Sequence, residues 1–151
     1  MSDLKDRLQA DLTGAIRARD EVTTATLRMA LAAITTEEVA GSSARQLSDD
    51  EVLKVLAREA KKRREAAEAF SSADRPELAD REQAERAVLD RYLPTQLGDQ
   101  EVADLVRAAI EETGATGMPH IGAVMKAAQA RAAGRADGRR LSAEVRKQLA
   151  G

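Results

Sequence analysis

Apolar residues recur along the chain at the spacing of one face of a helix. In the first segment, leucines at positions 4, 8 and 12 are followed by Ile16, so that every fourth residue is apolar. The same periodicity predicts three further helices before residue 94 and three shorter ones after it. The first four are expected at about residues 3–19, 21–40, 48–70 and 74–93. The last three close at Gly114, begin at Pro119, and include Leu141 to Leu149.

Capping residues mark two of the expected helix starts. Ser48 is followed three residues later by Glu51, which is the pattern of a capping box. Asp74 stands two residues before Pro76, as expected for an N-cap residue followed by an early helical proline. These signals predict the starts of the third and fourth helices.

The distribution of helix breakers predicts two domains. Seven of the nine glycines lie at or beyond residue 98, and Pro94 ends the fourth helical pattern. We therefore expect an N-terminal helical domain with four bundled helices at 1–93, a linker at 94–98 and a small C-terminal three-helix domain at 99–151.

Four charged residues interrupt the apolar faces of the third and fourth helices. At about 100° per residue, Glu59 and Arg63 lie in the middle of the apolar stripe of the third helix, four residues apart. Glu82 and Glu85 lie within the stripe of the fourth helix. Because burying an unpaired charge costs free energy, we expect these four side chains to meet in a polar cluster between the helices.

Two interpretations of this polar cluster are open. It is a structural network of ion pairs that sets the register of the helices, or it is a functional pocket whose carboxylates hold a cation or act as acid and base. A di-iron carboxylate bundle would need histidines beside the glutamates, and the single histidine, His120, lies in the other expected domain. The chain also lacks the Walker phosphate-binding loop of nucleotide-binding proteins, the glycine-rich fingerprint of dinucleotide-binding proteins and the HExxH motif of zinc proteases. We expect no metal, no cofactor and no catalytic residue.

The composition agrees with an all-α fold that has little side-chain volume in its core. Alanine accounts for 31 of the 151 residues, while Phe70 and Tyr92 are the only aromatic residues. Alanine favours helices, and the residues that favour strands are scarce. A β-sandwich, a β-barrel or a large α/β enzyme is close to excluded.

Cysteine is absent, which excludes disulfides and thiolate chemistry. No apolar run approaches 18 residues, and the first residues alternate charge with leucine, unlike a signal peptide or a membrane span. We expect a cytoplasmic protein without a membrane partner.

The formal net charge of −2 conceals a basic end of the chain. Between Lys126 and Lys147 there are seven basic and two acidic residues. A second basic run, from Arg58 to Arg64, lies on the third expected helix. Each run is either an ordinary solvated surface or a phosphate-binding one, and arginines beside the glycines at 134 and 138 suit bidentate phosphate contacts. The expected nucleic-acid contacts are Arg131, Arg135, Arg139, Arg140 and Lys147, with Arg58, Lys61, Lys62 and Arg64 as a second patch.

Several short motifs, taken in order, carry a resemblance to a known family. They are Leu27-Arg28-Met29, the Lys61-Lys62-Arg63-Arg64 run that continues to Phe70, Glu85, Tyr92-Leu93-Pro94 with Gln96-Leu97, Gly122 with Val124-Met125, and Gly134-Arg135-Ala136-Asp137-Gly138. Together they resemble the GatB/YqeY family, and the chain is similar to a stand-alone YqeY-like protein over essentially its whole length. The resemblance implies an all-α structure with an N-terminal bundle and a small C-terminal three-helix domain.

The resemblance also implies kinship with the tail of the GatB subunit of the tRNA-dependent amidotransferase, where the tail helps to hold the tRNA. Descriptions at the level of the family therefore often assign to such proteins a carbon–nitrogen ligase activity with glutamine as amido-N-donor. The amidase residues and the ATP-binding domain that this reaction requires are not recognisable in the sequence. We expect the isolated chain to be a tRNA- or RNA-associated binding module of translation, with amidotransferase subunits as further partners. A protein–protein adaptor, or an accessory subunit that takes part directly in amide transfer, is the alternative.

Overall fold

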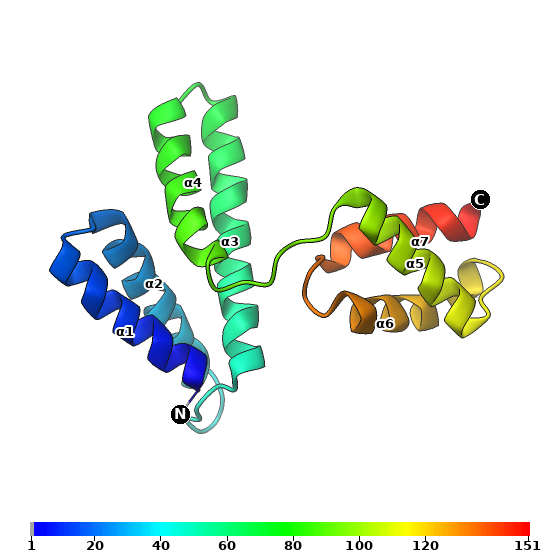
Figure 1. Cartoon of the computed structure of the whole chain (residues 1–151), viewed down its shortest axis with the longest axis horizontal. Helices are drawn as coiled ribbons and strands as arrows, with labels where there is room; N and C mark the ends of the chain where they lie inside the picture. Colours follow the sequence, from blue (N-terminus) through cyan, green and yellow to red (C-terminus); the bar gives the residue numbers. More distant parts are fainter. Residues whose placement is uncertain (1) are drawn as a thin grey trace. The chain divides into compact units, whose positions relative to one another are not determined.

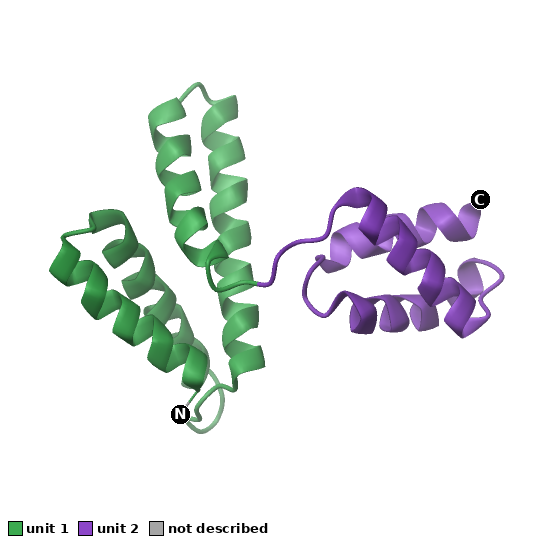
Figure 2. Ribbon diagram, in the orientation of Figure 1, with its two compact units in different colours: residues 1–93 green, residues 94–151 purple. Residues whose placement is uncertain are grey.

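The structure, a computed structural model, describes residues 2–151 and is all-helical over that range (Figure 1). Seven α-helices and one short 3-10 helix are present among these residues, and no strand occurs among them. The expected all-α class is therefore confirmed. Packing divides the chain into two compact units, Met1–Leu93 and Pro94–Gly151 (Figure 2).

The N-terminal unit consists of two antiparallel helix pairs. Helices α1 (Asp3–Ala18) and α2 (Glu21–Glu38) form the first pair, and α3 (Asp49–Ser72) and α4 (Pro76–Asp90) form the second (Figure 1). The core shared by the pairs is built mainly from aliphatic side chains, including Leu8, Leu27, Ile34, Leu56 and Leu89. The four helices expected in this part of the chain are confirmed, with ends that differ by a few residues.

The two helix starts that the capping signals predict have different outcomes. The capping box at Ser48 is confirmed, because its hydroxyl accepts from the backbone N–H of Glu51 and the Glu51 carboxylate accepts from the N–H of Ser48. The expected N-cap at Asp74 is wrong. Asp74 has a φ of 58°, in the left-handed region, whereas an N-cap residue needs an extended backbone. Arg75 takes that position, its side chain does not cap the backbone N–H groups of the helix, and α4 begins at Pro76.

A tyrosine ties the end of α4 to α1. The Tyr92 hydroxyl donates a hydrogen bond to Oδ2 of Asp11 at 2.5 Å, and the guanidinium of Arg7 lies 4.7 Å from the centre of the tyrosine ring. Burial, together with the hydrogen bond to Asp11, raises the pKa of Tyr92 far above its ordinary value. The hydroxyl is therefore a permanent hydrogen-bond donor at any physiological pH.

The C-terminal unit packs three helices over small side chains. Its elements are α5 (Asp99–Thr113), the 3-10 helix η1 (Met118–His120), α6 (Ile121–Ala132) and α7 (Gly138–Ala150). Alanines at 109, 128 and 132 are almost fully buried among Val106, Val124 and Val145. Because alanine occupies little volume, the helix axes must approach closely for this core to fill. The three expected helices are present.

The segment expected to be a linker packs against the C-terminal unit. Leu97 is only 7% exposed and belongs to the core of that unit. Its backbone N–H donates to the carbonyl of Arg135 at 2.7 Å, and Nε of Arg135 donates to the carbonyl of Thr95 at 3.2 Å. Residues 94–97 therefore lie along the loop between α6 and α7. The division of the chain into two independent domains stays a prediction.

None of the helices described in residues 2–151 is both long enough and apolar enough to cross a membrane.

Candidate nucleic-acid interface

Helix α7 carries a row of cations on the side opposite its buried face. Leu141 and Val145 are buried in the core of the C-terminal unit and define the inner side of the helix. At about 100° per residue, positions 139, 140, 146 and 147 all fall on an arc of about 120° on the outer side. We call this arc the α7 cationic face; its members are Arg139, Arg140, Arg146 and Lys147.

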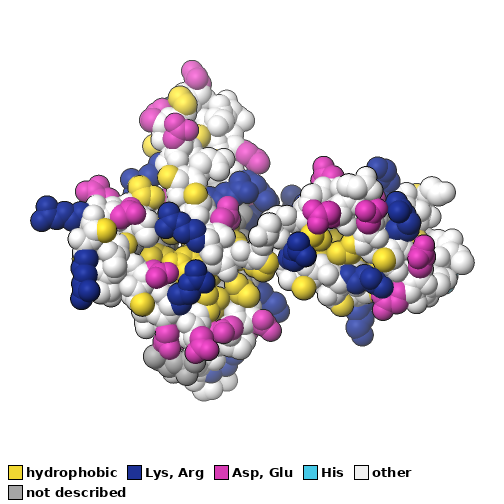
Figure 3. Space-filling view, viewed as in Figure 1, with side chains coloured by type: hydrophobic (Ala, Val, Ile, Leu, Met, Phe, Trp, Pro, Cys, Tyr) yellow, Lys and Arg dark blue, Asp and Glu magenta, His cyan; other side chains and the backbone are white. Residues whose placement is uncertain are grey.

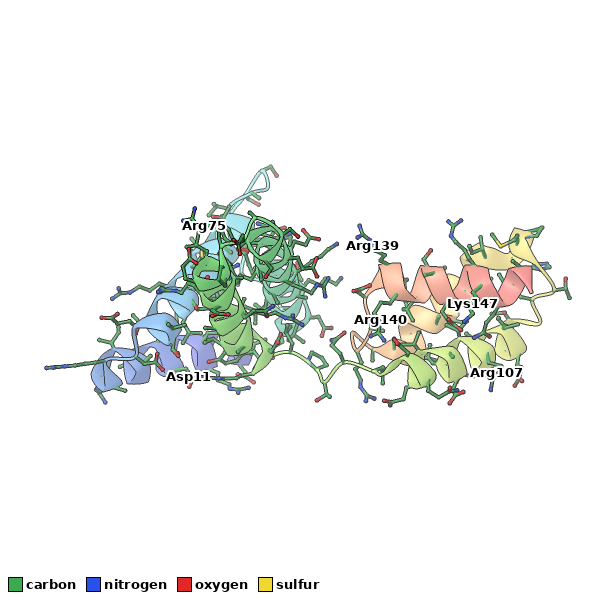
Figure 4. The ribbon with its side chains drawn as sticks, turned by 90° about the horizontal axis from the view of Figure 1, so that it is seen from above. Asp11, Arg75, Arg107, Arg139, Arg140 and Lys147 are labelled. Atoms are coloured by element: carbon green, nitrogen blue, oxygen red, sulfur yellow. The ribbon has the colours of Figure 1, made fainter. Side chains whose placement is uncertain are left out.

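Two members of the α7 cationic face have polar neighbours within the unit. Nη2 of Arg140 lies 3.0 Å from Oδ1 of Asp99, at the start of α5, and Nε of Arg146 donates to the Ser142 hydroxyl at 3.3 Å. Arg139 and Lys147 are exposed, and no carboxylate pairs with either among residues 2–151 (Figure 4). These two side chains can therefore meet a ligand without first leaving a protein partner.

The other cations expected to bind phosphate in this unit have protein partners. Nε of Arg131 lies 3.0 Å from Oε2 of Glu112, and Arg135 donates to the carbonyl of Thr95 as described above. Arg146 was not in the expected set, although its seven-residue spacing from Arg139 places the two side chains on one side of a helix. The structure thus brings together Arg139, Arg140 and Lys147 from that set and adds Arg146.

The glycine-containing turn before α7 includes a carboxylate, that of Asp137, at the start of the helix. Gly134 adopts a φ of 81°, and the Asp137 side chain caps α7 by accepting from the backbone N–H of Arg140 at 2.8 Å. This carboxylate lies at the start of the helix and disfavours a second anion there, so we expect phosphate contacts in this region to come from side chains.

Helix α5 carries the opposite charge to α7. Its five acidic residues are Asp99, Glu101, Asp104, Glu111 and Glu112. Its single cation, Arg107, lies 3.4 Å from Oδ1 of Asp104. In the view of Figure 3, where α5 lies toward the reader, carboxylates and cations are mixed over the C-terminal unit. Counted by helix, however, carboxylates are concentrated on α5 and cations on α6 and α7.

The second expected patch, on α3, is partly neutralised. Nη2 of Arg58 lies 3.5 Å from Oε2 of Glu37, and Nζ of Lys62 lies 3.4 Å from Oε2 of Glu59. Lys61 and Arg64 have no carboxylate partner among the residues that the structure describes. This patch thus offers two unpaired cations.

The expected polar cluster has Arg63 at its centre. Arg63 is 6% exposed. Its Nη1 lies 3.6 Å from Oε2 of Glu59, and its Nε lies 3.5 Å from Oε2 of Glu85. Arg63 also donates to the backbone carbonyl of Glu59 at 2.9 Å. Glu82 is half-buried, and no hydrogen bond or ion pair joins it to this group within residues 2–151.

Three cations form ion pairs with the two carboxylates at the centre of this cluster. Glu59 faces both Arg63 and Lys62, and Glu85 faces Arg63 and, at 3.2 Å, Nε of Arg81. Both carboxylates therefore already have cationic partners within the protein. Within residues 2–151, no group of three or more His, Cys, Asp and Glu side chains is arranged to hold a metal ion. The arrangement favours the structural interpretation of the cluster.

Comparison with known proteins gives the chain a family and a distant relative. A family model described as "Yqey-like protein" matches residues 5–149. The chain is also 33% identical, over 133 residues, to "Altered inheritance of mitochondria protein 41, mitochondrial" from Pyrenophora tritici-repentis (strain Pt-1C-BFP). That match covers 83% of this chain and 71% of the fungal protein. The name assigns the relative to mitochondria, and the cytoplasmic location expected for this chain stays a prediction.

Proposed function

Because the chain belongs to the YqeY-like family, we propose that it is a binding module for structured RNA, with tRNA as the ligand, that contacts phosphates through the α7 cationic face. The observation that carries this proposal is the row of four outward cations on α7, of which Arg139 and Lys147 have no carboxylate partner in residues 2–151. Cations of this kind release counterions from nucleic acid when they bind, which drives association.

The chemistry of the C-terminal unit suits phosphates better than bases. Phe70 and Tyr92 both lie in the N-terminal unit, so the C-terminal unit contains no Phe, Tyr or Trp side chain on which a base could stack. Arginine and lysine contacts to phosphate position a ligand without reading its sequence. The expected ligand is therefore recognised by its backbone and shape, as double-stranded RNA commonly is.

The acidic residues of α5 influence which surface of the C-terminal unit an RNA would contact. Its carboxylates repel phosphates at the surface where they lie, while the α7 cationic face attracts them. An RNA helix would therefore lie against α7 and away from α5.

A salt titration of tRNA binding to the full chain tests the proposal. Each phosphate contact contributes about 0.7 to 0.9 to the slope of log affinity against log salt. We expect the double variant R139A/K147A to bind more weakly and to lose about 1.4 to 1.8 from the magnitude of that slope, equally for different tRNA sequences. The measurement is fluorescence anisotropy between about 50 and 200 mM salt, the range over which such contacts change affinity most visibly.

Arg107 supplies the matched control for this experiment. It is an exposed arginine of the same unit, but it lies on α5 beside Asp104 (Figure 4). R107A should leave both affinity and salt slope unchanged. The proposal is wrong if R107A weakens binding as much as R139A/K147A, if binding does not depend on salt, or if no binding occurs below about 100 µM, the weak end of non-specific affinity.

The pair K61A/R64A measures the contribution of the second patch. These side chains are the unpaired cations of the basic run on α3. If the N-terminal unit also contacts the ligand, this variant reduces the salt slope as well, and the loss adds to that of R139A/K147A because the sites share no partner.

A further inference from the structure

Helix α2 meets α3 at a contact between a methionine and a buried arginine. Nη2 of Arg63 lies 2.9 Å from Sδ of Met29. Arg63 is 6% exposed, whereas Met29 is 40% exposed. The methionine therefore touches a buried guanidinium while remaining accessible to small solutes.

Arg63 lacks good hydrogen-bond acceptors. A guanidinium has five N–H donors, and one of them, on Nη1, is satisfied by the carbonyl of Glu59 at 2.9 Å. Nε is buried and has no hydrogen-bond acceptor in residues 2–151, although Glu85 Oε2 lies 3.5 Å from it. Nη2 carries two of the five donors, and its one acceptor in residues 2–151 is the Met29 thioether, which is a weak one. An oxygen atom attached to this sulfur would supply an acceptor that the guanidinium lacks.

We propose that Met29 is a sulfoxidation site for peroxides, and that Arg63 binds the sulfoxide oxygen and thereby strengthens the packing of α2 against α3 and α4. In the reaction with hydrogen peroxide, a lone pair of Sδ forms the new S–O bond as the O–O bond breaks. The sulfur loses two electrons, the peroxide is reduced, and the proton on the transferred oxygen passes to the departing hydroxide to give water. Arg63 takes no part in this proton transfer and donates a hydrogen bond to the product.

The product is held by a stronger bond than the reactant. A hydrogen bond from a charged donor to an oxygen is about twice as strong as one between neutral groups, and a thioether is a weaker acceptor still. The side chain of Met29 is unbranched and open to solvent, so its end can turn to place the oxygen against Nη2. Because Arg63 also contacts Glu85 on α4, the effect of oxidation extends over three helices.

Met118 provides an internal control. It is 39% exposed, almost the same as Met29, and no guanidinium donates a hydrogen bond to its sulfur in the part of the chain that the structure describes. Oxidation makes a methionine polar, and at an ordinary site it disrupts packing or has no effect. A gain in stability upon oxidation is therefore specific to a site such as Met29.

The test uses the full chain with M118L and M125L, which leaves Met29 and Met1 to react. After treatment with hydrogen peroxide, peptide mass mapping identifies oxidised Met29 and circular dichroism gives the melting temperature. We expect the melting temperature of the oxidised protein to rise by a few degrees. In M29L/M118L/M125L, treated in the same way, it should not change. A fall, an unchanged value, or an equal rise in the M29L control would overturn the proposal.

A second set of variants tests the acceptor without any oxidant. Glutamine places a carbonyl oxygen near the position of the sulfoxide oxygen, so M29Q should melt at a higher temperature than M29L. M118Q and M118L should melt at the same temperature. The side-chain N–H signals of Arg63 in nitrogen-15 NMR should shift and exchange more slowly with water in M29Q than in M29L. An M29Q protein that is no more stable than M29L, or unchanged Arg63 signals, would contradict the proposed contact.

Discussion

Glu38 shows how one carboxylate stabilises the N-terminal unit. Its Oε1 accepts from Nζ of Lys5 at 2.8 Å, and its Oε2 accepts from the backbone N–H of Leu47 at 3.3 Å. The hydrogen bond from Lys5 is the main reason that the pKa of Glu38 lies below its ordinary value of 4.5; the one from Leu47 acts in the same direction, and burial opposes both. The residue therefore ties α1 and the loop before α3 to the end of α2.

This depressed pKa predicts how stability changes with pH. A carboxyl group whose folded pKa is lowered contributes stability above its unfolded pKa, and this contribution is lost as the pH falls through the folded pKa. E38Q should therefore have a lower free energy of unfolding than the natural protein at about pH 7, and the difference should shrink as the pH falls below about 4.5. Urea unfolding at several pH values measures it.

Glu37 is a suitable control for this comparison. It is an exposed neighbour whose contact with Arg58 is 3.5 Å long, and exposed ion pairs contribute little to stability. E37Q should change the free energy of unfolding little at any pH. A difference between E38Q and the natural protein that is the same at about pH 3 as at about pH 7 would contradict the role given to Glu38.

At the scale of elements, the segment 94–97 is the least expected feature. A linker has few contacts of its own, but Leu97 enters the core of the C-terminal unit, and the neighbouring backbone bonds to the loop between α6 and α7. This segment and the loop belong to two of the motifs on which the family resemblance rests. Their pairing gives a structural reason for the presence of both motifs in one chain.

Replacement of Leu97 tests whether this contact stabilises the unit. Leu97→Ala should lower the free energy of unfolding by about 2 to 5 kcal/mol, because it removes buried methyl groups and leaves a cavity. Thr95→Ala is the matched control, since Thr95 is exposed and its backbone carbonyl, which Arg135 binds, remains. Chemical unfolding followed by circular dichroism gives both values. Equal stabilities of the two variants would show that residues 94–97 act as a spacer.

At the scale of the whole molecule, the position of Leu97 predicts where the C-terminal unit can be separated. We propose that the two compact units are independent domains divided at Leu93–Pro94. A fragment of residues 94–151 should then be helical and unfold cooperatively, although a unit of this size is only marginally stable. A fragment of residues 99–151 lacks Leu97 and should be much less helical. Circular dichroism during heating distinguishes them, and equal helicity of the two fragments would refute this boundary.

Much of the fold could be predicted because helix formation depends on neighbours in the sequence. Apolar periodicity placed all seven helices, and the spacing of Ser48 and Glu51 identified the start of α3. The N-cap of α4 was placed one residue too early, because Asp74 adopts a left-handed conformation that the pattern of residue types does not reveal. The same limit applies to Glu82, since the rotation of α4 about its axis decides that Glu85, and not Glu82, reaches Arg63.

The candidate interface shows the same division between local and tertiary information. Sequence spacing is enough to place the cations of α7 on its outer face. Which of them are free to bind a ligand depends on carboxylates that are distant in the sequence, such as Asp99 for Arg140 and Glu112 for Arg131. Exposure and pairing are properties of the folded chain, so no motif could separate Arg139 and Lys147 from the other cations.

By itself, then, the sequence determined the helices, their apolar faces and the resemblance to a family, because these follow from periodicity and from residue order. Only the tertiary structure decided that residues 94–97 join the C-terminal unit, that Arg63 lies between Glu59, Glu85 and Met29, and which cations remain unpaired. Each of these outcomes depends on side chains far apart in the chain, and their contacts exist only after the helices have packed.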